Sequence, residues 1–194
     1  MSNYIINSEL DYQNSYKAAI ENPERFWGTL ASENFVWRKK WDSVLEGTLQ
    51  DTNVKWFNNA ELNITENCID RHLAENGDKT AIIWEPNNPA EAAQHISYNE
   101  LHKKVNKMAN VLKLKGVKKG DRVCLYLPMI PELAISVLAC ARIGAIHSVV
   151  FAGFSSTALV SRINDSDCKL IITSESVCDL KVYPFLVKLI FILL

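Results

Sequence analysis

Hydrophobic and polar positions follow a regular period over the second half of the chain. Short apolar runs occupy residues 122–127, 146–151 and 169–173. The two segments between them, 130–143 and 156–164, carry apolar residues at helical spacing. Strands that alternate with helices through short loops form parallel sheets with right-handed crossovers. The pattern therefore predicts an α/β fold that contains a β-α-β-α-β layer.

Three further elements are predicted before this layer. Thr65 is placed to cap a short helix that ends at Asn76, before Gly77. Residues 80–84 and 95–97 predict the two strands of a hairpin, joined by a loop that contains two prolines. An apolar stripe at helical spacing then predicts an amphipathic helix, formed by Leu101, Val105, Met108 and Leu112 and closed by Gly116.

The first part of the chain, residues 8–64, is rich in aromatic residues but has no sustained period. Two short helices are predicted there, one over 11–21 and one that begins at Pro23, a residue suited to a first helical turn. Large aromatic side chains often anchor a segment that wraps over a larger body, and this is the interpretation we favour. A surface that stacks sugars or bases is the alternative.

Composition and charge narrow the class of protein. The 194 residues are 48% hydrophobic and 22% charged, which excludes disordered, collagen-like and disulfide-rich chains. A net charge of −1 gives no global reason to expect nucleic acid or an anionic membrane as a partner. The five cysteines lack metal-ligand spacing, and Cys124 and Cys140 lie in apolar runs, so we expect reduced thiols and a cytoplasmic location. Neither a secretory signal nor a transmembrane segment is predicted.

The most informative local motif follows the apolar run that ends at Phe151. The chain continues through Ala152 and Gly153 to Ser155 and Ser156, either of which can cap the helix that is predicted to follow. Ligands of parallel sheets bind beyond the carboxyl ends of the strands. Gly153 permits a positive φ or the close approach of a ligand, and a serine cap leaves helix amides that favour an anion. A simple turn is the alternative, because the motif lacks the glycines of a dinucleotide-binding fingerprint.

Two other features favour structural interpretations. The lysines between residues 101 and 122 are typical of a solvated helix face, although a phosphate-binding face is conceivable. We expect His147, which lies inside a predicted strand, to be a packing residue and not a base.

Long segments of the sequence closely resemble AMP-forming acetyl-CoA synthetases, which belong to the adenylate-forming superfamily. The resemblance rests on WFNNAELNITENCIDRHL (56–73), SYNELHKKVNKMANVLKLKGVKKGDRV (97–123) and YLPMIPELAISVLACARIGAIHSVVFAGFS (126–155). Residues 16–41 also resemble the N-terminal extension of that family. The resemblance implies a helical or irregular wrapping segment followed by part of the parallel sheet layer of the adenylate-forming large domain.

The implied domains are an acetyl-CoA synthetase-type N-terminal extension over 8–64, a partial AMP-binding domain over 65–177 and a divergent apolar tail over 178–194. The implied reaction converts acetate, ATP and CoA to acetyl-CoA, AMP and pyrophosphate through acetyl-adenylate, with Mg as cofactor. Phe151, Ala152 and Gly153 match the family segment beside the adenine end of CoA. No catalytic, ATP-binding or metal-ligating residue is expected within this chain, which has no glycine-rich loop ending in Pro-Lys-Gly. We therefore expect the 194 residues alone to be inactive.

The resemblance fades after Val177. Cys178, Asp179 and Leu180 stand where the family has basic residues and glycine near the 3′-phosphate of CoA. We hypothesise that a truncated reading frame produced this tail; a short paralogue with its own terminal strand or membrane-surface anchor is the alternative. Functional alternatives are a noncatalytic nucleotide- or protein-binding fragment and the same part of a propionate–CoA ligase. Expected partners are small-molecule substrates, without nucleic acid or membrane.

Overall fold

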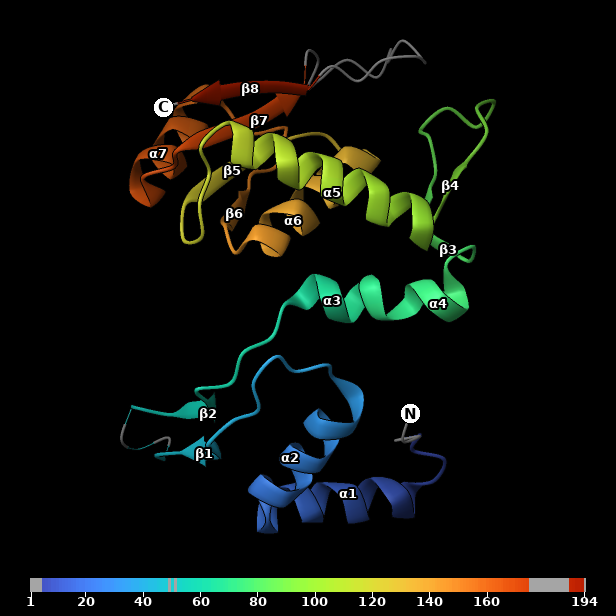
Figure 1. The fold of residues 1–194 in the computed structure, drawn as a ribbon, viewed down its shortest axis with the longest axis vertical. Helices are drawn as coiled ribbons and strands as arrows, with labels where there is room; N and C mark the ends of the chain where they lie inside the picture. Colours follow the sequence, from blue (N-terminus) through green and yellow to red (C-terminus); the bar gives the residue numbers. More distant parts are fainter. Residues whose placement is uncertain (1–4, 49, 51, 175–188, 194) are drawn as a thin grey trace. The chain divides into compact units, whose positions relative to one another are not determined.

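Two compact units make up the chain, Met1–Asn67 and Cys68–Leu194. The computed structural model describes residues 5–48, 50, 52–174 and 189–193 (Figure 1). The first unit holds two helices, a two-stranded sheet and most of a short third helix that ends at Cys68. The second holds a hairpin and a four-stranded sheet with its helices.

The first unit begins with the two predicted helices, α1 (Glu9–Glu21) and α2 (Pro23–Asn34). The side chain of Ser8 caps α1, and that of Asn22 caps α2 by accepting the N–H of the third helical residue. Proline occupies the first turn of α2, as predicted. An antiparallel pair, β1 (Ser43–Glu46) and β2 (Lys55–Asn58), completes the unit.

Aromatic side chains of the first unit pack on one another. The ring of Trp41 lies edge-on to Trp37 at 5.1 Å and to Phe57 at 5.0 Å between centroids. Trp27 and Trp56 also meet edge-on, at 6.3 Å, and both keep more than a third of their surface exposed. Edge-to-face pairs stabilise small aromatic clusters beyond the burial of their area. These rings thus form a partly exposed cluster that links α2 to the segments of β1 and β2.

The helix predicted over 65–76 is divided into three parts. These are α3 (Ile64–Cys68), a 3-10 turn and α4 (Leu73–Asn76). The prediction that Thr65 caps the helix is wrong, because Thr65 is fully buried inside α3. The side chain of Asn63 accepts both the backbone N–H and the hydroxyl of Thr65, at 2.9 and 2.7 Å. Asn63 therefore performs the role that the sequence suggested for Thr65.

The predicted hairpin and amphipathic helix are both present. β3 (Thr80–Trp84) pairs antiparallel with β4 (Gln94–Ser97), and α5 (Tyr98–Leu114) follows directly. A capping box starts α5: the Ser97 side chain accepts the Glu100 N–H, and the Glu100 carboxylate accepts the Ser97 N–H. The predicted stripe is buried, at Leu101, Val105, Met108 and Leu112.

The four-stranded sheet has the order β6-β5-β7-β8. β5 is parallel to both β6 and β7, which confirms the predicted β-α-β-α-β layer. β8 pairs antiparallel with β7 at the edge of the sheet. The elements, in chain order, are β5 (Arg122–Tyr126), α6 (Pro131–Ile143), β6 (Ile146–Val149), α7 (Ser156–Ser166), β7 (Leu170–Ser174) and β8 (Leu189–Leu193).

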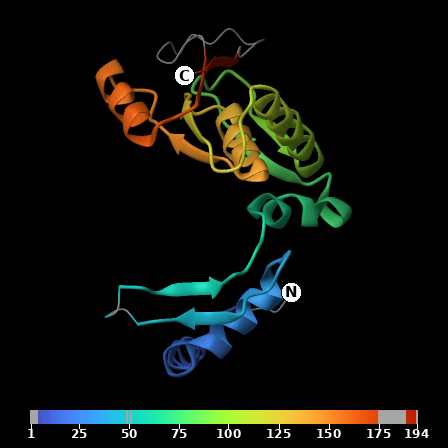
Figure 2. The same cartoon turned by 60° about the vertical axis from the view of Figure 1, so that its left-hand side comes forward.

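Helices cover both faces of this sheet, with α5 and α6 on one face and α7 on the other (Figure 2). Successive side chains of β5 point to opposite faces of the sheet, so they contribute to two hydrophobic clusters. Val123 and Leu125 belong to the larger cluster with α5 and α6, whereas Cys124 and Tyr126 belong to the smaller one with α7. α6 packs against α5 and also against the strands, so it is enclosed as its largely apolar sequence predicts.

The edge strand β6 departs from the sequence prediction. It ends at Val149, two residues earlier than predicted, and His147 is exposed. The prediction of a packing histidine is therefore wrong, because β6 has no neighbouring strand on its outer side among the described residues.

In the described part of the chain, no helix is long and apolar enough to span a bilayer.

Candidate functional site

The carboxyl edge of the parallel sheet lies where β5 ends at Tyr126 and β6 ends at Val149. Val150 is buried and donates its N–H to the carbonyl of Leu125 at 2.9 Å, which continues the strand pairing by one residue. Phe151 is the first residue beyond this bond. The predicted site residues thus form the turn that leads from β6 to α7.

The three predicted residues have different environments. Phe151 is 65% exposed, whereas Ala152 is buried under the turn. The backbone of Gly153 does not have a positive φ, so that possibility is not realised. A Cβ at Gly153 would lie 2.6 Å from Cε1 of the Phe151 ring. A side chain at residue 153 would therefore require the exposed phenyl ring of Phe151 to move.

Tyr126 connects the end of β5 to this turn. Its hydroxyl lies 2.9 Å from the carbonyl oxygens of both Ala152 and Phe154 and donates to them. The turn closes with a bond from the Phe154 N–H to the Phe151 carbonyl, at 3.0 Å. Ser155, one of the two candidate caps in the sequence, then caps α7 by accepting the N–H of Ala158. A side chain from one strand therefore holds the loop that follows its neighbour.

An aromatic pair and a cation lie at the surface of the turn. The rings of Phe151 and Phe154 meet edge-on, with centroids 5.9 Å apart, and Phe154 is 41% exposed. The guanidinium carbon of Arg162, on α7, lies 4.5 Å from the centroid of the Phe154 ring. No pattern in the sequence marks Tyr126, Phe154 or Arg162 as site residues. The only signal for Arg162 is its position seven residues after the cap of α7, which places it two helical turns along.

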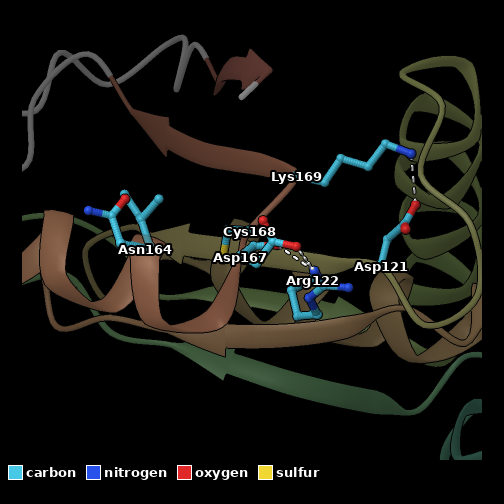
Figure 3. A pocket seen from close by; sticks show the side chains of 7 residues that line it. Asp121, Arg122, Asn164, Asp167, Cys168 and Lys169 are labelled. Carbon is cyan, nitrogen blue, oxygen red and sulfur yellow. Dashed lines mark hydrogen bonds and ion pairs between the residues drawn. The ribbon is translucent and has the colours of Figure 1, made fainter.

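A separate hollow of about 620 Å³ lies at the opposite, amino-terminal edge of the sheet (Figure 3). Arg122, at the start of β5, pairs with the carboxylate of Asp167 and also donates to its carbonyl oxygen at 2.7 Å. Lys169 Nζ lies 3.0 Å from a carboxylate oxygen of Asp121. Both cations of the hollow therefore have a carboxylate partner.

The hydrogen bonds of this hollow hold backbone segments together. The backbone N–H of Lys118 and the ammonium group of Lys169 donate to Asp121 and lower the pKa of its carboxyl group. Lys169 also donates to the carbonyl of Gly116, at 2.8 Å. Because its charges balance and its donors are occupied by protein acceptors, this hollow is a structural junction and a poor site for an anion.

Thiol and metal chemistry receive little support. Burial raises the pKa of Cys124 to about 11 and that of Cys140 to about 12, so both are weak nucleophiles. Among the described residues, no group of three His, Cys, Asp or Glu side chains is arranged to hold a metal ion. The surface at Phe151, by contrast, offers exposed aromatic rings and a guanidinium. Such a surface can stack a flat heterocycle and pair with a phosphate.

Comparison with known proteins identifies the family. Residues 12–68 match the model "Acetyl-coenzyme A synthetase N-terminus", and residues 69–189 match "AMP-binding enzyme". Acetyl-coenzyme A synthetase from Magnetococcus marinus is 54% identical over 174 residues, which are 90% of this chain and 27% of the relative. Acetyl-coenzyme A synthetase 2 from Pseudomonas aeruginosa is 53% identical over 165 residues, 85% of this chain and 25% of the relative.

A solved structure supports the fold. Acetoacetyl-CoA synthetase from Streptomyces lividans superposes with a TM-score of 0.74 over 81% of this chain and 24% of its own, at 23% identity. The chain thus spans about a quarter of the length of the relatives that it matches. By both family models and by its identity to these relatives, the chain belongs to the acetyl-coenzyme A synthetase family of AMP-binding enzymes.

Proposed function

We propose that this chain supplies the N-terminal quarter of an AMP-forming acetate–CoA ligase. The complete reaction joins acetate to AMP with release of pyrophosphate, and the CoA thiol then displaces AMP. The support is an identity of about 50% to acetyl-coenzyme A synthetases over most of the chain. Small-molecule substrates and a cytoplasmic location belong to the same proposal.

The contribution of this chain to that reaction is a surface for the adenine end of CoA, formed by Phe151, Ala152 and Gly153. The observation that carries this role is the 65% exposure of Phe151 at the carboxyl edge of a parallel sheet. An exposed phenyl ring at such an edge can stack a purine. Tyr126 fixes the turn through the Ala152 carbonyl, so the ring is presented on a rigid support.

We also propose a division into an N-terminal extension over 8–64, a partial AMP-binding domain over 65–177 and an apolar tail over 178–194. The two family models meet between residues 68 and 69, and the two compact units meet between Asn67 and Cys68, which supports the first boundary. Residues 175–188 lie outside the described part of the chain, so the second boundary rests on sequence alone.

The groups that bind ATP and Mg belong, in this proposal, to the part of the relatives that this chain does not span. The sequence has no Pro-Lys-Gly loop, and the described surface at Phe151 offers no carboxylate pair for a cation. We therefore expect no acetate-dependent release of pyrophosphate from the 194-residue chain. Turnover by the pure chain would contradict this expectation.

A chimera tests the function itself. Residues 12–174 of this chain replace the aligned segment of the Magnetococcus marinus synthetase, and pyrophosphate release is measured with acetate, ATP and CoA. The chimera should retain acetate-dependent release of pyrophosphate. Phe151→Ala in the chimera should raise the KM for CoA roughly 10-fold through lost stacking, with the KM for acetate and ATP unchanged. Equal effects on all three KM values would contradict a role at CoA.

A further inference from the structure

Arg162 is an exposed arginine whose position is restrained from two sides. Its guanidinium lies over the face of the Phe154 ring, 4.5 Å from the centroid, and its Nη1 donates to the Ala158 carbonyl at 3.0 Å. A cation over an aromatic face is attracted by the ring quadrupole. These contacts hold the side chain toward the first turn of α7, so less conformational entropy is lost when it binds a ligand.

The charge of Arg162 is not neutralised within the described part of the chain. Three other arginines pair with carboxylates: Arg38 with Glu66, Arg122 with Asp167 and Arg142 with Asp70. Arg162 forms no ion pair with any described residue, although Asp165 lies only three positions further along α7. A restrained guanidinium with unused donors is suited to bind a phosphate, often through two parallel hydrogen bonds.

Phe154 places this cation beside the surface assigned to adenine. Its ring receives Arg162 on one face and meets the Phe151 ring edge-on at 5.9 Å. One aromatic ring therefore separates the guanidinium from the exposed phenyl that we assign to the purine. A nucleotide that carries a phosphate on the ribose of its stacked base matches this arrangement.

We propose that Arg162 binds the 3′-phosphate of CoA and that Phe154 positions the guanidinium for it. The proposal rests on the proposed CoA surface at Phe151, Ala152 and Gly153. It also accounts for a departure in the sequence, since Cys178, Asp179 and Leu180 provide no cation for this phosphate. Arg162 supplies the missing charge from the helix that follows the adenine-binding turn.

Binding of CoA and 3′-dephospho-CoA to the 194-residue chain tests this proposal. Dissociation constants come from NMR titrations, and the 3′-phosphate signal of CoA is followed by phosphorus NMR. The wild-type chain should bind CoA about 10-fold more tightly than dephospho-CoA, as expected for one charge-assisted phosphate contact. Arg162→Gln should bring that ratio to about 1 and leave the affinity for dephospho-CoA unchanged.

Matched variants distinguish a specific role of Arg162 from a general effect of positive charge. Lys107→Gln removes one exposed positive charge from α5 and should keep the 10-fold ratio. Arg162→Lys and Phe154→Leu should each lower the ratio of the two affinities in part. Circular dichroism checks that every variant is folded. Retention of the full ratio in folded Arg162→Gln would overturn the role of Arg162. Failure of the wild-type chain to bind either ligand would overturn the proposed CoA surface and this inference together.

Discussion

The hydroxyl of Tyr126, at the end of β5, donates to the carbonyl oxygen of Ala152, 26 residues later, at 2.9 Å. This bond joins the last residue of one parallel strand to the loop that follows its neighbour. It crosses the sheet edge at which parallel sheets bind their ligands. The proposed CoA surface is therefore anchored by a contact that neither segment shows in its own sequence.

Replacement of Tyr126 by phenylalanine should loosen this turn. The variant keeps the ring and loses the bonds to the carbonyls of Ala152 and Phe154, which should lower the free energy of unfolding by about 1 kcal/mol. The N–H of Phe154 should exchange with deuterium faster. Tyr16→Phe on the exposed side of α1 is the control. Unchanged exchange at Phe154 would show that the hydroxyl does not restrain the loop.

The ion pair between Arg142 and Asp70 should stabilise the second unit. Two nitrogens of Arg142, on α6, donate to the Asp70 carboxylate at 3.1 and 2.6 Å, and both side chains are less than a third exposed. Arg142→Gln leaves the carboxylate without this partner and should lower the free energy of unfolding by roughly 2 kcal/mol in urea denaturation. Arg25→Gln, on an exposed arginine, should change it little.

A double-mutant cycle measures the coupling of this pair. Asp70→Asn combined with Arg142→Gln should cost less than the two single changes added together, because the double variant leaves no unpaired charge. Strict additivity would mean that the pair contributes nothing through its mutual contact.

Acid should destabilise the chain partly through Glu100. The N–H and hydroxyl of Ser97 donate to its carboxylate and lower its pKa below the ordinary value of 4.5. The unfolded state then binds a proton more readily, so this stabilisation is complete above about pH 4.5 and is lost as the pH falls through the folded pKa. Between pH 5 and 3, the thermal midpoint should fall less in Glu100→Gln than in the wild type.

The capping box explains why glutamine is the appropriate change. A glutamine oxygen can still accept the Ser97 N–H, but it does not titrate. Glu33→Gln, on an exposed residue of α2, provides the same chemical substitution away from the capping box. Identical pH profiles for the wild type and Glu100→Gln would contradict the assigned role.

Cysteine labelling should follow burial. At pH 8, iodoacetamide should modify Cys68 before the other cysteines in the described part of the chain, because its side chain is exposed. Cys124 and Cys140 should remain unmodified until denaturant is added, since burial raises their pKa values and blocks access. Mass spectrometry after timed labelling measures the order. Early modification of Cys140 would contradict its position between α6 and the sheet.

The sequence predicted the elements of the parallel layer because their hydrophobic period reports burial directly. The sequence prediction was wrong where the environment of a residue depends on contacts with other segments of the chain. Thr65 looked like a cap, but it lies inside α3, and Asn63 accepts the Thr65 N–H at the start of that helix. His147 looked buried, yet no described strand covers the outer side of β6.

The candidate site was likewise predicted in part. The position of Phe151, Ala152 and Gly153 at a strand end follows from periodicity and family resemblance. The contact between the Phe151 ring and the backbone of Gly153 does not follow from either. Arg162 and Tyr126 enter the site only through distances between segments far apart in the chain, and no local pattern marks such contacts.

The most direct test of the account is an NMR titration of the isotope-labelled 194-residue chain with CoA. The backbone amide signal of every assigned residue is monitored during the titration. The account predicts that the largest shifts occur at residues 151–154, beside the exposed Phe151 ring, and that they become smaller in Phe151→Ala. Shifts confined to the hollow around Arg122 and Lys169, or no shifts at millimolar CoA, would contradict it.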